Sequence, residues 1–145
     1  MYSGKVSVKE NICNISKKLG YLGVSYSQVQ GYDINSSNGK HFFVNIANEE
    51  HAMLSKYDAS TKELVHTGDI KNVIMHGNDC VYYKGDYYIV CGSNSKKIKC
   101  YDSTFNYKKT YTFVPKSTYL HGNDISQISC IAHYKDSKFI LGYGS

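Results

Sequence analysis

A tetrapeptide that recurs at a near-constant spacing is the feature that most constrains the fold of this chain. The sequence His76-Gly77-Asn78-Asp79 returns letter for letter at 121–124, and Gln30-Gly31-Tyr32-Asp33 is a weaker third copy. The aspartates that end the three copies are 46 and 45 residues apart. A period of this length is typical of repeated supersecondary units, each of which buries its apolar face against a neighbour. The chain is therefore predicted to be a repeat protein.

The composition of the chain favours strands as the repeated elements. Among 145 residues there are 15 Tyr and 5 Phe, while Trp is absent and Pro occurs once. Aromatic and β-branched side chains suit the pleated, half-buried surface of a sheet. A chain of this length can also bury a substantial core. We therefore predict an all-β protein.

The middle repeat shows the strand pattern most clearly. A Lys84-Gly85-Asp86 turn separates the apolar runs 80–83 and 87–91, which predicts a hairpin. Alternating residues over 97–101 and a run at 108–113 predict two more strands. Four short antiparallel strands in about 45 residues correspond to one blade of a β-propeller.

The flanking repeats follow the same plan. The first predicts strands at 33–35 and 41–46, a third that ends at Tyr57-Asp58, and a fourth around 63–65. Tyr57-Asp58 matches Tyr101-Asp102 of the middle repeat. The last repeat predicts a strand over 125–131, a turn over 134–138 and a strand at 139–141. It is then two strands short of a blade.

The N-terminus is predicted to supply the missing pair of strands. Shifted by two periods, Lys5-Val6-Ser7-Val8 falls on 96–99 and Lys17-Lys18 falls on Lys108-Lys109. The expected organisation is one domain over 1–145, divided into outer strands of a shared blade at 1–24, a blade at 25–70, a blade at 71–115 and the inner strands of the shared blade at 116–145.

Three blade-equivalents do not make a closed ring, because propellers have about four to eight blades. We expect a head-to-tail homodimer in which the N-terminal strands of one protomer complete the C-terminal blade of the other. The product is a six-bladed ring with two-fold symmetry. Two alternatives stay open, namely a fragment of a longer propeller and a flat assembly of three sheets.

The repeat pattern resembles that of six-bladed propellers of the broad gluconolactonase-like and NHL-type kind. The resemblance rests on Asn78-Asp79 and Asn123-Asp124, each followed by a strand, a turn and another strand. In the lactonase-like members Asn, Asp and Glu at blade entrances hold an axial divalent cation, so these two pairs are the matching positions. The chain departs from that pattern, because Tyr32 replaces Asn in the first copy and no Glu occurs at a blade entrance.

The tetrapeptide also supplies the candidate site residues. The loop that enters the innermost strand of a propeller blade lies at the rim of the central channel, so we predict that the variable members of the motif bind a ligand: His76, His121, Gln30, Asn78, Asn123 and Tyr32. The invariant glycines are expected where the backbone is left-handed or crowded, and the invariant aspartates where backbone N–H groups need an acceptor: Gly31, Gly77, Gly122, Asp33, Asp79 and Asp124. A hydrogen bond from His76 and His121 to a neighbouring blade is the open structural alternative.

The expected function is binding rather than catalysis. The chain has no Gly-x-Ser-x-Gly elbow, phosphate loop, His-Glu-x-x-His or dinucleotide fingerprint. We predict a cofactor-free protein that captures a small polar or anionic ligand, for example a nucleotide signal sequestered by a phage-encoded inhibitor. One alternative is a metal-dependent, lactonase-like hydrolase with a divalent cation and a histidine base. The other is a scaffold that holds a protein partner.

Charge, hydropathy and cysteine spacing argue against three classes of protein, namely nucleic-acid-binding, membrane-spanning and cysteine-ligated metal proteins. The net charge of +5 comes from scattered Lys without any Arg, which disfavours nucleic acid as a partner. No apolar run reaches the length of a membrane span and no signal core begins the chain, so we expect a cytoplasmic protein. The cysteines have no metal-knuckle spacing and are expected to be reduced and mostly buried: Cys13, Cys80, Cys91, Cys100 and Cys130. Four histidines are interpreted as surface or internally satisfied groups: His41, His51, His66 and His133.

Overall fold

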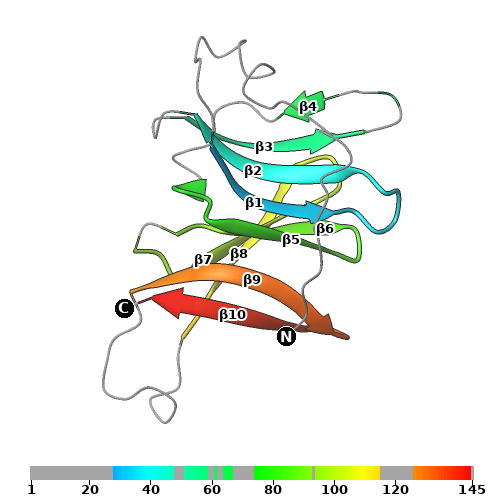
Figure 1. Cartoon of the computed structure of the whole chain (residues 1–145). Coiled ribbons are helices and arrows are strands. Elements are labelled where there is room, and N and C mark those ends of the chain that lie inside the picture. Colours follow the sequence, from blue (N-terminus) through cyan, green and yellow to red (C-terminus); the bar gives the residue numbers. More distant parts are fainter. Residues whose placement is uncertain are drawn as a thin grey trace, which may run out of the picture.

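The protein is built from antiparallel sheets, which confirms the all-β prediction (Figure 1). The computed structural model describes residues 28–47, 51–58, 61, 64–66, 74–92, 94–114 and 126–144. All elements in this part of the chain are strands, numbered β1 to β10. They form three sheets, each a meander in which consecutive strands are neighbours.

The first sheet contains β1 (Gln28–Ile34), β2 (His41–Ala47), β3 (His51–Tyr57) and β4 (Leu64–His66), in that order. The turn between β1 and β2 closes on Asn35, whose N–H donates to the Lys40 carbonyl at 2.8 Å. The Asn35 carbonyl in turn accepts the N–H of Gly39 at 2.7 Å. Gly39 has a φ of 69°, a left-handed conformation that glycine adopts without steric cost. The turn therefore forms between the two strands predicted at 33–35 and 41–46.

The second sheet contains β5 (Asp79–Tyr83), β6 (Asp86–Val90), β7 (Lys97–Tyr101) and β8 (Tyr107–Thr112). The β5–β6 turn has positive φ at both central residues, 48° at Lys84 and 91° at Gly85. Two positive φ values give a tight turn whose twist matches that of the flanking strands. The strand ends differ from the predicted ones by a single residue, and Cys91 follows β6 instead of ending it.

The third sheet pairs β9 (Gln127–Lys135) with β10 (Lys138–Gly144). This hairpin is longer than predicted, because the expected turn over 134–138 shrinks to Asp136 and Ser137. Asp136 has a φ of 52°, which allows the tight reversal. Two register shifts, one next to Phe139 and one next to Tyr143, accommodate the extra length.

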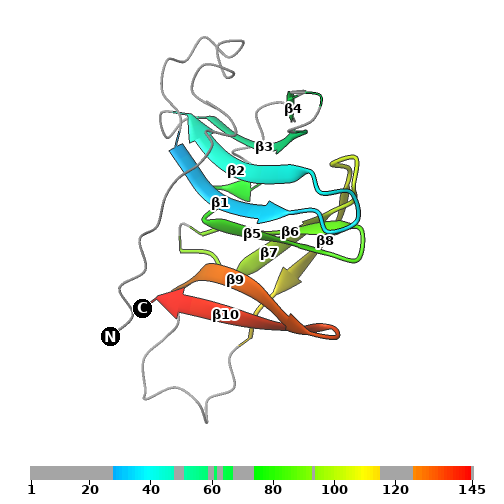
Figure 2. The ribbon, with the colours of Figure 1, turned by 45° about the vertical axis from the view of Figure 1, so that its right-hand side comes forward.

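The three sheets stack so that their first strands, β1, β5 and β9, lie side by side (Figures 1 and 2). The second sheet is the middle layer, and its strands alternate between two cores as expected for a period of two. One face joins the core shared with the first sheet: Leu54, Ile74, Cys80, Tyr82, Tyr87, Ile89 and Tyr101. The other face joins the core shared with the third sheet: Val81, Val90, Ile98, Ile128 and Ile131.

The two described copies of the tetrapeptide occupy different places in their sheets. His76, Gly77 and Asn78 precede β5, as the sequence predicted. The first copy was expected in the same place but lies inside β1, where the register shift at Gln30 forms a bulge. The sequence similarity therefore matched the loop that precedes β5 with a bulged segment inside β1. The third copy, 121–124, lies outside the described residues.

Glycine is needed in these two copies for two different physical reasons. Gly77 has a φ of 62°, the left-handed conformation expected at a blade entrance. A Cβ at Gly31 would lie 2.6 Å from the Asp79 Cα and 2.7 Å from the Cys80 nitrogen. Gly31 is therefore required because the β1 backbone approaches the β5 backbone too closely for any side chain.

The four described cysteines form no disulfide. Cys80, Cys91 and Cys100 are free and buried, whereas Cys130 is free and exposed. Burial raises the pKa of the Cys91 and Cys100 thiols, which keeps both protonated near neutral pH. Cys13 lies outside the described residues. In the part of the chain that the structure describes, no helix is long and apolar enough to cross a membrane.

Asp102 organises the β7–β8 turn and gives a pH prediction. Its carboxylate accepts the Asn106 N–H at 2.9 Å and both the hydroxyl and the N–H of Thr104, at 2.8 and 2.9 Å. These bonds lower the pKa of Asp102 from 3.8 to about 2. The carboxylate therefore stabilises the turn above pH 3.8, and this contribution is lost as the pH falls through 2. A carboxyl ¹³C titration should give a pKa near 2, and an ordinary value would contradict the turn geometry.

Candidate functional site

A polar hollow of about 530 Å³ opens where the first strands of the three sheets meet. Its wall is formed by residues at the end of β1, along most of β5 and in the middle of β9. Its polar side chains come from all three sheets: Tyr32, Asp33, Ser36, Asp79, Tyr82 and His133. Concave sites lined by converging polar groups are the usual places for small ligands. This hollow is therefore the candidate functional site.

Two carboxylates in the hollow tie neighbouring sheets together. Asp33 Oδ1 accepts the Ile34 N–H at 2.8 Å, and Asp33 Oδ2 accepts the Tyr82 N–H of β5 at 2.8 Å. Asp79 repeats the arrangement one sheet further on, with Cys80 at 2.8 Å and Ile131 of β9 at 2.9 Å. Acceptance of backbone N–H groups is what the sequence led us to expect of these aspartates. The bonds join successive sheets, however, instead of closing a single turn.

Burial affects the ionisation of the Asp79 carboxyl group. Burial raises the pKa of Asp79, the N–H groups of Ile131 and Cys80 oppose the rise, and the nearby charge of Asp33 adds to it. Burial and the charge of Asp33 also raise the pKa of the Tyr32 phenol. Each carboxylate oxygen has two lone pairs, so both aspartates can accept a further hydrogen bond while they hold the sheets. The hollow therefore favours ligand groups that donate hydrogen bonds.

His133 lies at one side of the hollow, on β9. Its Nε2 is 3.0 Å from the Asp136 carbonyl oxygen, which fixes the ring against the β9–β10 turn. The ring lies 4.5 Å from the Tyr83 ring and 5.7 Å from the Phe139 ring, measured between centroids. This exposed histidine is held in place by the second and third sheets together. In the sequence His133 stands alone, because its aromatic partners lie on other strands.

Of the residues predicted to bind a ligand, Tyr32 lines the hollow and is 45% exposed. Gln30 lies at the β1 bulge, and His76 is half-buried ahead of β5, both outside the hollow. The Asn78 side chain packs against Gly92, where its amide occupies the position of a Cβ, and Gly92 also has a left-handed φ of 63°. His121 and Asn123 lie outside the described residues, as do Gly122 and Asp124.

A metal site requires several ligating side chains that face one ion. In the described ranges no group of three or more His, Cys, Asp or Glu side chains is placed to hold a metal ion. Asn78, one of the positions that the lactonase resemblance implies, is directed at Gly92 instead of standing beside Asp79 as a ligand pair.

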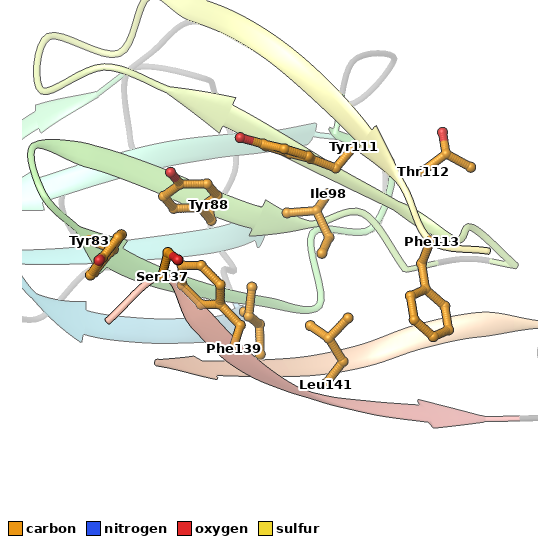
Figure 3. A pocket seen from close by; sticks show the side chains of 10 residues that line it. Tyr83, Tyr88, Ile98, Tyr111, Thr112, Phe113, Ser137, Phe139 and Leu141 are labelled. Carbon is orange, nitrogen blue, oxygen red and sulfur yellow. The ribbon is translucent and has the colours of Figure 1, made fainter. Parts of the chain in front are cut away.

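A second cleft, of about 360 Å³, separates the second sheet from the third (Figure 3). Its wall is mostly aromatic and aliphatic: Tyr83, Tyr88, Ile98, Tyr111, Thr112, Phe113, Ile131, Ser137, Phe139 and Leu141. This cleft was not predicted from the sequence, because its residues are spread over six strands and a turn. It is apolar, in contrast to the hollow at the first strands.

Comparisons with protein-family models, curated proteins and solved structures found no match to this chain.

Proposed function

We propose that the chain is half of a β-propeller that binds a small polar ligand, without catalysis, at the hollow formed by β1, β5 and β9. The observation that carries this proposal is the convergence of Tyr32, Asp33, Asp79 and His133 from three sheets on one cavity. In a propeller the first strand of each blade faces the central channel, where ligands gather. Three meanders with adjacent first strands support this architecture.

The wall of the hollow defines the ligand more closely than the sequence did. Two carboxylates that accept hydrogen bonds suit hydroxyl or amino groups, and Tyr32 offers a ring for stacking on a planar group. No lysine is among the described residues that line the hollow, so its wall offers little to a phosphate. For a nucleotide signal, we therefore propose that the base and the sugar occupy the hollow. Sequestration by a phage-type inhibitor in the cytoplasm stays a prediction.

A binding role also agrees with the bonds that the carboxylates already make. Asp33 and Asp79 each hold a backbone N–H of the next sheet, at 2.8 and 2.9 Å. A general base must change its protonation state during each turnover. Such a change at Asp79 would weaken the tie between β5 and β9. No observation in the described part of the chain favours the hydrolase or the scaffold over ligand binding.

Calorimetric titration with a panel of nucleosides, nucleotides and monosaccharides tests this proposal. Tyr32→Ala should weaken binding of the best ligand by about tenfold, because stacking on an aromatic ring contributes about 1–3 kcal/mol per base. Tyr134→Ala is the matched control, since Tyr134 is 59% exposed and lies outside the hollow. Absence of binding by the wild type, or equal weakening by the two variants, would contradict the proposal.

A further inference from the structure

The hydroxyl groups of three tyrosines gather at one end of the apolar cleft between the second and third sheets. Figure 3 shows Tyr83, Tyr88 and Tyr111 with their hydroxyl groups directed to this end, whereas Phe113 and Leu141 lie at the other. The cleft volume of about 360 Å³ falls within the range of small-molecule sites, about 300–1,000 Å³. A molecule that suits both ends has an apolar body and a polar group.

Both sheets contribute to the apolar part of the wall. Ile98 of β7 and Phe113 just after β8 come from the second sheet, and Phe139 and Leu141 of β10 come from the third. Ile98 belongs to the buried core, while the other three pack against this core and stay partly exposed. Contact with an apolar ligand would remove their remaining exposed surface from water, which is favourable. The rings of the wall favour an aromatic body, because aromatic pairs gain from offset and edge contacts beyond the area that they bury.

The phenols at the polar end can donate hydrogen bonds to a ligand. The Tyr83 hydroxyl is buried and has no hydrogen-bond partner among the described residues. A buried polar group without a partner costs free energy, so a ligand oxygen that accepts from Tyr83 is stabilised there. Tyr88 packs against the same ring as Tyr83, that of Phe139, at 5.2 Å between centroids. Burial raises the pKa of Tyr88, so its phenol also keeps its proton at neutral pH.

The charges beside the cleft favour an anion. The ammonium groups of Lys84 and Lys109 lie 5.3 and 4.7 Å from the centroids of two rings that line the cleft, those of Tyr83 and Tyr111. No Asp or Glu is among the described residues of its wall. Asp86, at the start of β6, is already paired with another lysine at 2.6 Å. A negatively charged ligand group is therefore attracted to the end of the cleft that holds the phenols.

We propose that this cleft binds a small aromatic carboxylate, with the ring system between the two sheets and the carboxylate at the Tyr83 end, close to Lys84 and Lys109. The site goes beyond the ligand proposal for the hollow at β1, β5 and β9 and does not depend on it. The hollow disfavours such a ligand, because the charges of Asp33 and Asp79 repel a carboxylate. The two cavities thus select opposite kinds of molecule.

Calorimetric titration with 2-naphthoate tests the charge argument, with 2-naphthamide as a neutral compound of nearly the same size. The wild type should bind the acid about fivefold more tightly than the amide, because each exposed ion pair accounts for about two- to threefold in affinity. Lys84→Gln/Lys109→Gln should remove most of this preference. Lys97→Gln/Lys99→Gln is the matched control and should keep it, since these two lysines alternate with Ile98 on β7 and do not line the cleft.

Two tryptophan variants and an NMR experiment test the location. Leu141→Trp fills the apolar end and should abolish saturable binding of 2-naphthoate. Ile140→Trp adds the same side chain on the other face of β10, where Ile140 is 59% exposed and outside the cleft, and should bind as the wild type does. In the wild type, 2-naphthoate should shift the methyl resonances of Ile98 and Leu141. It should leave those of Leu54 unchanged, because Leu54 belongs to the core between the first and second sheets.

Four results would each overturn the proposal: no saturable binding of 2-naphthoate by the wild type, equal affinities for the acid and the amide, equal effects of the two tryptophan variants, or methyl shifts at Leu54 instead of Ile98 and Leu141. A wild-type mass of 32.8 kDa, twice 16.4 kDa, that 2-naphthoate neither enters nor dissociates would show that a second copy covers the cleft, and would overturn it too. The ligand panel for the hollow contains no aromatic acid, so the two proposals can fail separately.

Discussion

Gly31→Ala is expected to lower the free energy of unfolding by about 3 kcal/mol, the upper part of the usual range for overpacking. The added Cβ would lie 2.6 Å from the Asp79 Cα and 2.8 Å from the Asp79 carbonyl carbon. Both atoms belong to the backbone of β5, which its pairing with β6 holds in place. No side chain can rotate away to relieve the contact. The two first strands must separate, and the core between the first and second sheets loosens with them.

Urea unfolding monitored by circular dichroism measures this effect, with Gly144→Ala as the control. Gly144 also lies in a strand, but its Cβ would meet Gln127 Nε2 at 3.5 Å, an ordinary van der Waals distance. We expect Gly144→Ala to change the free energy of unfolding by less than about 1 kcal/mol. Similar losses in the two variants would show that the close approach of β1 to β5 is not what requires glycine at position 31.

Asp79→Ala is expected to lower the free energy of unfolding by about 2–3 kcal/mol, because it leaves the Ile131 N–H without its acceptor. This N–H belongs to β9, whereas the carboxylate belongs to β5, so the loss falls on the junction of the second and third sheets. Amide hydrogen exchange should report the site directly. The Ile131 amide should lose protection, while amides in the interior of the second sheet keep theirs.

Asp79→Asn is the matched variant, because it keeps one acceptor oxygen and removes the charge. Its loss should be smaller than that of Asp79→Ala, because the amide oxygen still accepts one of the two N–H groups, of Cys80 and Ile131, that the carboxylate accepts. Burial raises the pKa of Asp79 above 3.8, so the folded protein binds this proton more tightly than the unfolded chain. Asp79 therefore reduces stability as the pH rises from 3.8 through the raised pKa, and Asp79→Asn should remove this decrease. A wild-type pH profile identical to that of Asp79→Asn would contradict the assignment.

The strands of the middle repeat were predictable because two independent signals agree there. Lys84-Gly85 provides a tight turn, and the apolar runs 80–83 and 87–91 flank it on both sides. The first repeat was harder to predict, because the likeness of 30–33 to 76–79 placed the start of the strand too late. The bulge at Gln30 shifts the register of β1, and no local sequence rule reveals a bulge.

The candidate site was predictable in part. The repetition of Asp33 and Asp79 singled out both aspartates, although the sequence did not show that they would line a shared hollow. His133 and Ser36 do not belong to the repeated motif, and three-dimensional neighbours alone bring them to the cavity. His76 and Asn78 were predicted from their position at a blade entrance. Tertiary packing places them outside the hollow, with Asn78 against Gly92.

The hydrogen bonds that Asp33 and Asp79 accept from the next sheet affect how such a chain folds and how its length can change. Within each sheet the strands pair with their immediate neighbours in the sequence, so these contacts form locally and early. The ties Asp33–Tyr82 and Asp79–Ile131 span 49 and 52 residues and can form only once two sheets exist. Each pair of successive sheets is thus linked by the same kind of bond, in which a carboxylate of one sheet accepts an N–H of the next. Duplication or loss of one sheet leaves the contacts between the other sheets intact. The number of sheets can therefore vary without changes to the rest of the sequence.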